Sequence, residues 1–191
     1  MVKRLFDFVL SLLGLVLFSP VFLIIYIGQK LTYKGPAFFV QERIGKGGRP
    51  FNIYKFRTMV VQGEQDGVPR LAEENDDRLT KFGRFLRNHH LDELPQLWNV
   101  LKGDMSFIGP RPERKYFIDQ IMEHDKRYVE LYQIRPGVTS YATLYNGYTD
   151  TMEKMLRRLE LDLYYLEHRS WWFDIKIIMK TFLNIIFGKK F

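Results

Sequence analysis

Residues 15–28 read LVLFSPVFLIIYIG and place a serine–proline pair in the middle of an apolar run. From Leu5 to Ile27 nearly every residue is Leu, Ile, Val or Phe, about the ~20 residues that a helix needs to cross a hydrocarbon core. The transfer free energy of these side chains outweighs the cost of Asp7 near one end of the run. A cleaved signal peptide is disfavoured, because the apolar run is too long and no small-x-small cleavage site precedes Lys30. The sequence therefore predicts a retained membrane segment.

Ser19 and Pro20 predict a break in this segment. Pro20 removes the amide that would donate to the carbonyl of residue 16, and the Ser19 hydroxyl can satisfy a freed group nearby. Basic residues flank the run on both sides, namely Lys3, Arg4, Lys30 and Lys34. The positive-inside rule then draws both ends toward the cytoplasm. A re-entrant helix–break–helix anchor over residues 1–30 satisfies both ends, and a proline-kinked spanning helix is the alternative.

Composition narrows the class of protein. The chain has 191 residues, 46% of them apolar, which suffices for one domain with a buried core plus an anchor. Its formal charge of +7 indicates an anionic partner, such as nucleic acid, anionic lipid or a phosphorylated substrate. No nucleic-acid recognition motif is present, so nucleic acid is not an expected partner. The chain has no cysteine, which excludes disulfides and leaves oxygen or imidazole as metal ligands.

Residues 35–59 predict a β-hairpin, because two β-branched and aromatic runs flank a glycine-rich turn. The turn sequence GKGGRP lacks the spacing of a phosphate loop, so its glycines are assigned to the turn. Lys55 and Arg57 lie two residues apart in the second strand and are expected to project from one face. The pair is a candidate phosphate-binding site, and a solvated strand face is the alternative.

Helical patterns dominate the rest of the chain. Apolar spacing predicts two helices between residues 79 and 101 that meet near residues 88–93. Helices are also expected over residues 114–132, 151–169 and about 171–187. The last of these combines paired tryptophans with lysines, which is typical of a helix at a lipid interface, and a buried core helix is the alternative. The polar stretch 61–77 has no assigned chemistry, and residues 134–150 are expected to be loop or short strand.

The stretch GDMSFIGPRPERKYF, residues 103–117, predicts a rigid loop. Pro110 and Pro112 fix their own φ angles and restrict the residues before them. Arg111 is held between the two prolines. Its guanidinium group can bind two phosphate oxygens with little ordering cost, so the three residues form a candidate phosphate-binding loop.

Five motifs together resemble the bacterial sugar transferase family, the small monotopic phosphoglycosyl transferases: KRLFD (residues 3–7), the SP pair (19–20), KFRTM (55–59), LDELPQLWNVLKGDMSFIGPRP (91–112) and RPGVT (135–139). The resemblance covers essentially the whole chain. It implies a small mixed α/β domain with a β-hairpin and several helices over residues 31–191. It also implies that this domain lies on the cytoplasmic face of the bacterial inner membrane, anchored by the re-entrant helix.

The resemblance further implies an activity, the transfer of sugar 1-phosphate from a nucleoside diphosphate sugar, commonly a UDP-sugar, to polyprenol phosphate such as undecaprenyl phosphate. UMP would be released, and surface polysaccharide or glycan assembly would begin. Asp92 is the implied nucleophile, which forms a covalent phosphosugar–aspartate. Glu93 is implied to bind metal or manage protons, and both carboxylates are implied to hold Mg²⁺. Membrane lipids are further expected partners, and a homo-oligomer is left open.

Other interpretations of these residues stay open. Asp92 lies three residues before Pro95, near an expected helix start, so a simple helix cap is the alternative to catalysis. Arg135 is a further candidate substrate contact. From Ser140 the chain reads SYATLYNGYTD, whereas many family members have Gly-Trp-Ala-Gln after RPGVT, so no particular sugar is inferred. A catalytically silent, membrane-tethered binding protein is the alternative function.

Overall fold

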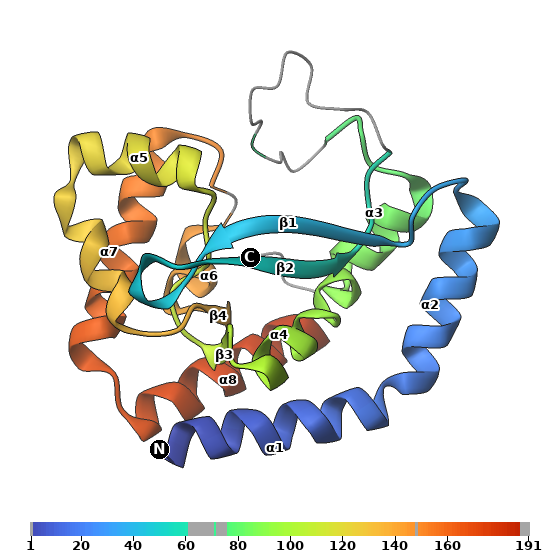
Figure 1. The fold of residues 1–191 in the computed structure, drawn as a ribbon, viewed down its shortest axis with the longest axis horizontal. Helices are drawn as coiled ribbons and strands as arrows, with labels where there is room; N and C mark the ends of the chain where they lie inside the picture. Colours follow the sequence, from blue (N-terminus) through green and yellow to red (C-terminus); the bar gives the residue numbers. More distant parts are fainter. Residues whose placement is uncertain (1, 61–70, 72–75, 148, 188–191) are drawn as a thin grey trace. The chain divides into compact units, whose positions relative to one another are not determined.

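Helices make up most of the computed structural model, which describes residues 2–60, 71, 76–147 and 149–187 (Figure 1). The chain divides into two compact units, and each is described by itself. The first unit comprises Met1–Gln41, Asn52–Arg70 and Asn75–Gly103, and the second comprises Glu42–Phe51, Leu71–Glu74 and Asp104–Phe191. Within the described residues, this mixture of a β-hairpin and many helices confirms the expected small α/β class.

The first unit begins with α1 (Val2–Leu17) and α2 (Ser19–Thr32), which are bent by 58° with respect to each other. The Ser19 hydroxyl donates to the Val16 carbonyl at 2.8 Å, the group that loses its amide partner because residue 20 is proline. The predicted break is therefore confirmed. Among the described residues, the bent pair has the length and apolar composition of a membrane segment, whereas no single helix does.

The remaining elements of the first unit pack against α1 or α2. They are most of strand β2 (Pro50–Phe56), helix α3 (Lys81–Asn88), the 3₁₀ turn η3 (Leu91–Glu93) and helix α4 (Gln96–Lys102). Ile25 of α2, Phe56 of β2 and Leu86 of α3 form the buried centre of this core. The buried Gln29 side chain also donates to the Arg57 carbonyl, which ties α2 to the end of β2.

The β-hairpin runs through both units. β1 (Phe38–Ile44) pairs with β2, and the turn η1 (Lys46–Gly48) joins them. Gly47 and Gly48 have φ angles of 70° and 69°, which a residue with a Cβ adopts only with strain. The assignment of these glycines to a turn is confirmed.

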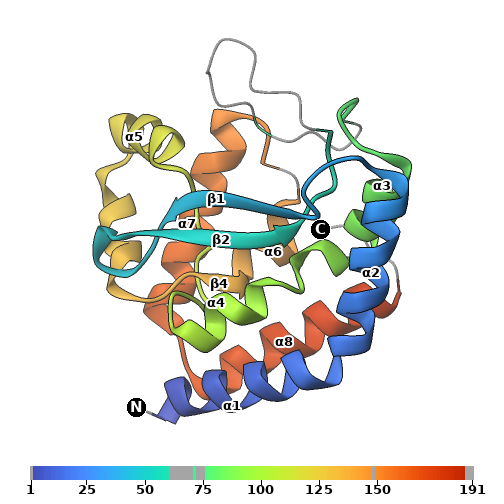
Figure 2. The same ribbon diagram turned by 45° about the vertical axis from the view of Figure 1, so that its right-hand side comes forward.

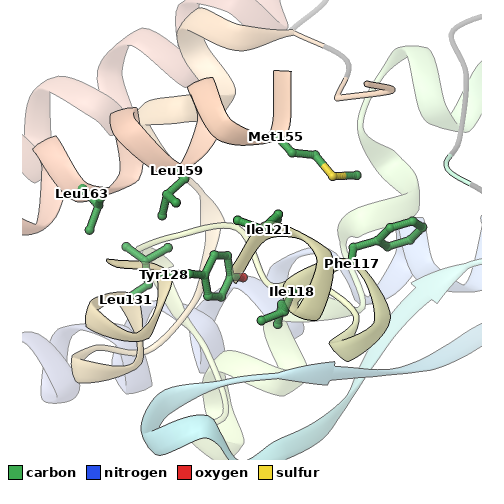
Figure 3. Close-up of a cluster of buried hydrophobic side chains, with 8 residues drawn as sticks. All are labelled: Phe117, Ile118, Ile121, Tyr128, Leu131, Met155, Leu159 and Leu163. Carbon is green, nitrogen blue, oxygen red and sulfur yellow. The ribbon is translucent and has the colours of Figure 1, made fainter. Parts of the chain in front are cut away.

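The second unit contains α5 (Lys115–His124), the 3₁₀ segment η4 (Lys126–Gln133), α7 (Met152–His168) and α8 (Trp171–Ile186). Figure 3 shows its largest apolar cluster, in which side chains of α5, η4 and α7 meet. Met155, Leu159 and Leu163 recur every four residues, so one face of α7 supplies three of the eight buried residues of this cluster. A second cluster joins Ile108, Tyr165 and Ile177, and the Tyr165 hydroxyl donates to the buried Asp174 carboxylate at 2.6 Å.

Two short parallel strands complete the second unit. β3 (Ser106–Ile108) pairs with β4 (Gly137–Thr139), with Ser106 opposite Gly137. A Cβ atom on Gly109 would lie 2.2 Å from the Arg135 carbonyl oxygen, so only glycine fits there. This close approach holds the Pro110–Pro112 segment beside Arg135 and Pro136 along the backbone.

Three expectations about local structure need correction. The helix expected over residues 114–132 is interrupted at Asp125, which is extended and accepts a hydrogen bond from the Arg127 amide, so η4 begins there. Residues expected to be loop or strand after 134 include helix α6 (Tyr141–Asn146), because Ser140 caps it by accepting from the Thr143 amide. The expected rigid loop contains strand β3. The stretch 61–77 lies almost entirely outside the described residues.

Candidate active site

Asp92 and Glu93 lie in the 3₁₀ turn between α3 and α4, as the expectation of two helices meeting near residues 88–93 requires. His90 precedes the turn with φ 53° and ψ 19°, a left-handed conformation that is uncommon for a residue other than glycine. Pro95, not Asp92, occupies the N-cap position of α4, and His90 occupies that of η3. The interpretation of Asp92 as a simple helix cap is therefore wrong.

Lys55 of β2 reaches this turn. Its ammonium group lies 2.5 Å from Glu93 Oε1, and about four fifths of each side chain is buried, with exposures of 20% and 16%. A short ion pair that is largely buried is less screened than a surface pair. The structure thus brings together three of the residues that the sequence nominated: Lys55, Asp92 and Glu93.

Asn99 of α4 fixes the strand that carries Lys55. Its Oδ1 accepts from the Tyr54 amide at 3.1 Å, and its Nδ2 donates to the Asn52 carbonyl at 2.7 Å. The Asn99 side chain is fully buried, so these bonds form away from water and constrain the strand strongly. Because Tyr54 is adjacent to Lys55, Asn99 sets the position of the ammonium group relative to the carboxylates.

Asp92 has an unusual electrostatic environment. Burial, which leaves it 7% exposed, raises the pKa of its carboxyl group from 3.8 to about 6, with Lys55 opposing this shift, Glu93 adding to it and Arg87 opposing it. The group is therefore mostly ionised at neutral pH yet poorly solvated. A desolvated carboxylate with this pKa is suited to act as a nucleophile or a base.

Arg87 is the functional candidate that the sequence analysis missed. It lies in the last turn of α3 and contributes positive charge to the surroundings of Asp92. The available signal was a cation at the end of a predicted helix, five residues before the carboxylate. Its side-chain position depends on how α3 meets η3, which the helical pattern alone does not specify.

Arg57 does not join Lys55 as expected. Strand β2 ends at Phe56, and the Arg57 guanidinium group turns to the start of β1, where it donates to the carbonyls of Pro36 and Phe38 at 3.0 and 3.3 Å. It also stacks over the Phe39 ring at 5.7 Å. The expectation that both cations share one target is wrong, because the residue after a strand end no longer follows the strand alternation. A role for Arg57 in phosphate binding stays a prediction.

In the second unit, Pro110, Arg111 and Pro112 line a small pocket with Tyr128 and Tyr132. The Arg111 amide donates to Oδ2 of Asp162, a residue of α7, at 3.4 Å. Helix α7 therefore helps to hold the loop in place. Arg135 precedes Pro136, which also lines this pocket. The rigidity of the proline-flanked Arg111 and phosphate binding by Arg111 and Arg135 stay predictions.

Glu113 follows this loop and is held by three groups. Its carboxylate accepts from Arg158 Nη2 at 2.9 Å and from the Arg114 amide at 2.8 Å, and Arg43 Nη1 lies 3.7 Å away. Burial alone would raise the pKa of Glu113, but Arg158 and Arg43 outweigh it and the pKa is lowered. This carboxylate therefore carries a stable charge and supports the loop.

The expectation that Asp92 and Glu93 hold a magnesium ion rests on the chemistry of the two carboxylates. Within the described residues, no group of three or more His, Asp or Glu side chains is arranged to hold a metal. Mg²⁺ is, however, commonly bound through one or two carboxylates, with phosphate oxygens and water completing its coordination. Asp92 and Glu93 supply two hard oxygen ligands in consecutive positions, which matches this requirement.

The chain is similar in sequence to known proteins along nearly its whole length. The chain is 41% identical over 187 residues to the UDP-N-acetylgalactosamine-undecaprenyl-phosphate N-acetylgalactosaminephosphotransferase of Aeromonas hydrophila, covering 98% of this chain and 44% of that protein. It is 45% identical over 183 residues to the UDP-glucose:undecaprenyl-phosphate glucose-1-phosphate transferase of Escherichia coli (strain K12), covering 95% and 39%. The chain thus spans less than half the length of these two relatives.

A shorter relative matches along most of its length. An uncharacterized sugar transferase of Bacillus subtilis (strain 168) is 36% identical over 184 residues, which is 96% of this chain and 87% of that protein. The family model described as bacterial sugar transferase matches residues 1–188. The chain belongs to the bacterial sugar transferase family.

Proposed function

We propose that this protein transfers sugar 1-phosphate from a UDP-sugar to undecaprenyl phosphate and thereby initiates the assembly of a surface polysaccharide or glycan. The observation that carries the proposal is the buried Asp92, poorly solvated and adjacent to the Lys55–Glu93 ion pair. Family membership supports the reaction class, and the names of the two relatives support UDP-sugar and undecaprenyl phosphate as substrates. Those names differ in the sugar, so no particular hexose is proposed.

The reaction proceeds in two displacements at one phosphorus atom. Asp92 attacks the β-phosphorus of the UDP-sugar, the bond to the bridging oxygen breaks, and UMP leaves with that oxygen and its electron pair. A phosphosugar–aspartate remains. A phosphate oxygen of undecaprenyl phosphate then attacks the same phosphorus, and the bond to Asp92 breaks, which restores the carboxylate. Neither displacement needs a proton, so the ionised state of Asp92 at neutral pH suits this role.

The cations have electrostatic roles in this scheme. Lys55 and Arg87, which oppose the raised pKa of Asp92, also offset charge repulsion between the carboxylate and the incoming diphosphate. Arg57, Arg111 and Arg135 are proposed phosphate ligands, with Pro110 and Pro112 restraining Arg111. Asp92 and Glu93 would hold Mg²⁺, which supplies positive charge to the diphosphate when bound. Glu93 binds the metal or manages protons.

Membrane placement is part of the proposal. Exposed apolar side chains cover α1 and α2, including Leu5, Leu13, Val16, Leu23 and Ile24. The bend at Ser19–Pro20 and the flanking basic residues support a segment that enters the bacterial inner membrane and returns to the cytoplasmic face. In the second unit, α8 exposes Trp171, Trp172 and Phe182, which supports an interfacial position for that helix.

The test is UMP release by the purified full chain in nanodiscs, with a panel of UDP-sugars, Mg²⁺ and undecaprenyl phosphate. We expect release with at least one sugar, dependent on the lipid and absent from Asp92→Asn. Mass spectrometry of the wild type with donor alone should detect the phosphosugar adduct on Asp92. Release that persists in Asp92→Asn would exclude the covalent mechanism. A folded protein that releases no UMP from any donor would favour the silent binding protein instead.

A further inference from the structure

The N-terminal helix has a polar side that its membrane role does not explain. Arg4, Asp7 and Ser11 recur at intervals of three and four residues, so they lie along one face of α1. Asp7 is 5% exposed and Ser11 is fully buried, whereas Leu5, Leu13 and Val16 on α1 are each more than half exposed. A helix that served only as an anchor would gain nothing from burying charged and polar groups.

This polar face packs against α4. The two helices lie side by side in both views (Figure 1, Figure 2) and are in contact along their lengths. Gly14 continues the face, and a Cβ atom there would lie 3.1 Å from the Leu97 side chain of α4. The approach of α1 to α4 is therefore close from the start of α1 to its last turn.

Arg4 makes a bidentate contact with the end of α4. Its Nη1 and Nη2 donate to the carbonyls of Val100 and Leu101 at 2.5 and 2.7 Å. These carbonyls are in the last turn of the helix and carry the negative end of the helix dipole. The Val100 carbonyl also accepts from the Gly103 amide at 3.1 Å. Gly103 ends α4 with φ 96°, and a Cβ atom there would lie 3.1 Å from Arg4 Nη2. The glycine thus leaves room for the guanidinium group.

The same short helix connects Arg4 to the carboxylate pair. Glu93 lies three residues before α4 begins, and Asn99 of α4 holds the backbone of Asn52 and Tyr54, next to Lys55. A displacement of α4 would move both members of the Lys55–Glu93 ion pair. Since α4 has only seven residues, it has little stability of its own and depends on contacts such as that of Arg4.

We infer that Arg4 is a positioning residue for the Asp92–Glu93 site, and that α1 is a structural part of this site as well as a membrane segment. The kinetic part of this inference rests on the proposed function. The structural part does not, because it concerns the ordering of α4 and β2.

The test compares Arg4→Met and Arg4→Lys with Lys3→Met in the full chain, in nanodiscs. Lys3→Met removes the same charge from the same end of α1, so it controls for membrane orientation. We expect Arg4→Met to lower kcat at least about tenfold with less than about threefold change in KM, because small displacements of catalytic groups reduce turnover strongly. Arg4→Lys should recover part of the loss, since it keeps one charged donor. Lys3→Met should stay within about twofold of the wild type.

Hydrogen–deuterium exchange provides a readout that is independent of activity. In Arg4→Met, amides of residues 91–102 and 52–56 should exchange at least about threefold faster, while those of α7 and the membrane-bound fraction stay unchanged. Unchanged exchange over residues 91–102 would overturn the inference, as would an equal kcat loss in Lys3→Met. If Arg4→Met does not fold, the same comparison is decided with Arg4→Lys. If the wild type releases no UMP but Arg4→Met still exchanges faster over residues 91–102, the proposed function is refuted and the positioning role stands.

Discussion

Asp92 in the first unit and Glu113 in the second are equally buried, each with 7% of its surface exposed, yet their pKa values shift in opposite directions. Glu113 accepts a hydrogen bond directly from the Arg158 guanidinium group and is further stabilised by Arg43 and the Arg114 amide. Asp92 shares its surroundings with a second carboxylate, and the nearest ammonium group bonds to that neighbour instead. Burial therefore does not decide the character of a carboxylate in this protein. The compensating charge does.

The two shifts have opposite consequences for stability. The folded protein binds a proton at Asp92 more tightly than the unfolded chain does. At pH 7 the ionised Asp92 therefore lowers the free energy of unfolding by about 3 kcal/mol. This stability is regained as the pH falls from about 6 toward 3.8. Glu113, whose pKa is lowered, contributes stability above its ordinary pKa of 4.5 and loses it as pH falls. The first carboxylate is retained at a cost to folding, which is typical of a reactive group.

The largest expected effect is that of Asp92→Asn. UMP release should fall at least about 10⁴-fold, because the change removes the oxygen that we propose as the nucleophile. The same change should raise the free energy of unfolding by about 1–3 kcal/mol and the unfolding midpoint by several degrees, because a buried, undercompensated charge is removed. Activity and thermal unfolding in the same detergent provide the measurement. The exposed Asp119→Asn is the control, and a drop in stability for Asp92→Asn would contradict the comparison.

Arg158→Met tests the other carboxylate. Removing the main partner of Glu113 leaves a buried charge without adequate compensation, and we expect a destabilisation of about 3–5 kcal/mol, measured by chemical denaturation. The neighbouring, exposed Arg157→Met is the matched control and should change stability by less than about 0.5 kcal/mol. Adding Glu113→Gln to Arg158→Met should recover part of the loss. An unchanged free energy of unfolding in Arg158→Met would mean that the Glu113 carboxylate is not stabilised by charge compensation.

Lys55→Met alters the compensation at Asp92 itself. In the wild type, kcat/KM should fall about tenfold per pH unit below the Asp92 pKa of about 6, because the protonated acid cannot attack. Without Lys55, the pKa of Asp92 should rise and this acidic limb should move to higher pH by about one unit. The pH profile of UMP release between pH 5 and 8 measures the shift. Lys81→Met, an exposed lysine of the same unit, should leave the limb in place.

The sequence predicted the elements that depend on local pattern. The break at Ser19–Pro20, the glycine turn and the helix that became α7 follow from proline geometry, positive φ angles and apolar spacing. The sequence also nominated Lys55, Asp92 and Glu93, which lie together in the structure because Asn99 joins β2 to α4.

What the sequence did not predict depends on groups far apart in the chain. The Arg87 charge near Asp92, the diversion of Arg57 to Pro36 and Phe38, and the Arg158–Glu113 pair each require tertiary contacts. The helix α6 was missed because one hydroxyl, that of Ser140, starts it within a turn-rich sequence. Periodicity carries no information about such single bonds.

The smallest expected effect on activity is that of Asp162→Asn, which tests whether a raised pKa alone identifies a catalytic carboxylate. Asp162 is 2% exposed, and burial raises the pKa of its carboxyl group to about 7, with Arg158 opposing this shift. Its Oδ2 accepts from the Arg111 amide, and the Ser140 hydroxyl and the Ala142 amide also oppose the shift. Asp162 thus shares the burial and the raised pKa of Asp92 but lacks an adjacent carboxylate–lysine pair.

Asp162→Asn keeps an oxygen acceptor for the Arg111 amide and removes a buried group whose raised pKa costs stability at pH 7, so the free energy of unfolding should rise by about 1–3 kcal/mol, as for Asp92→Asn. UMP release should stay within about fivefold of the wild type, and the pH dependence of unfolding between pH 6 and 8 should weaken. If Asp162→Asn were instead as inactive as Asp92→Asn, a raised pKa would no longer distinguish the nucleophile. The assignment of Asp92 would then depend on the mass of the trapped adduct alone, because only that measurement identifies the oxygen that carries the phosphosugar.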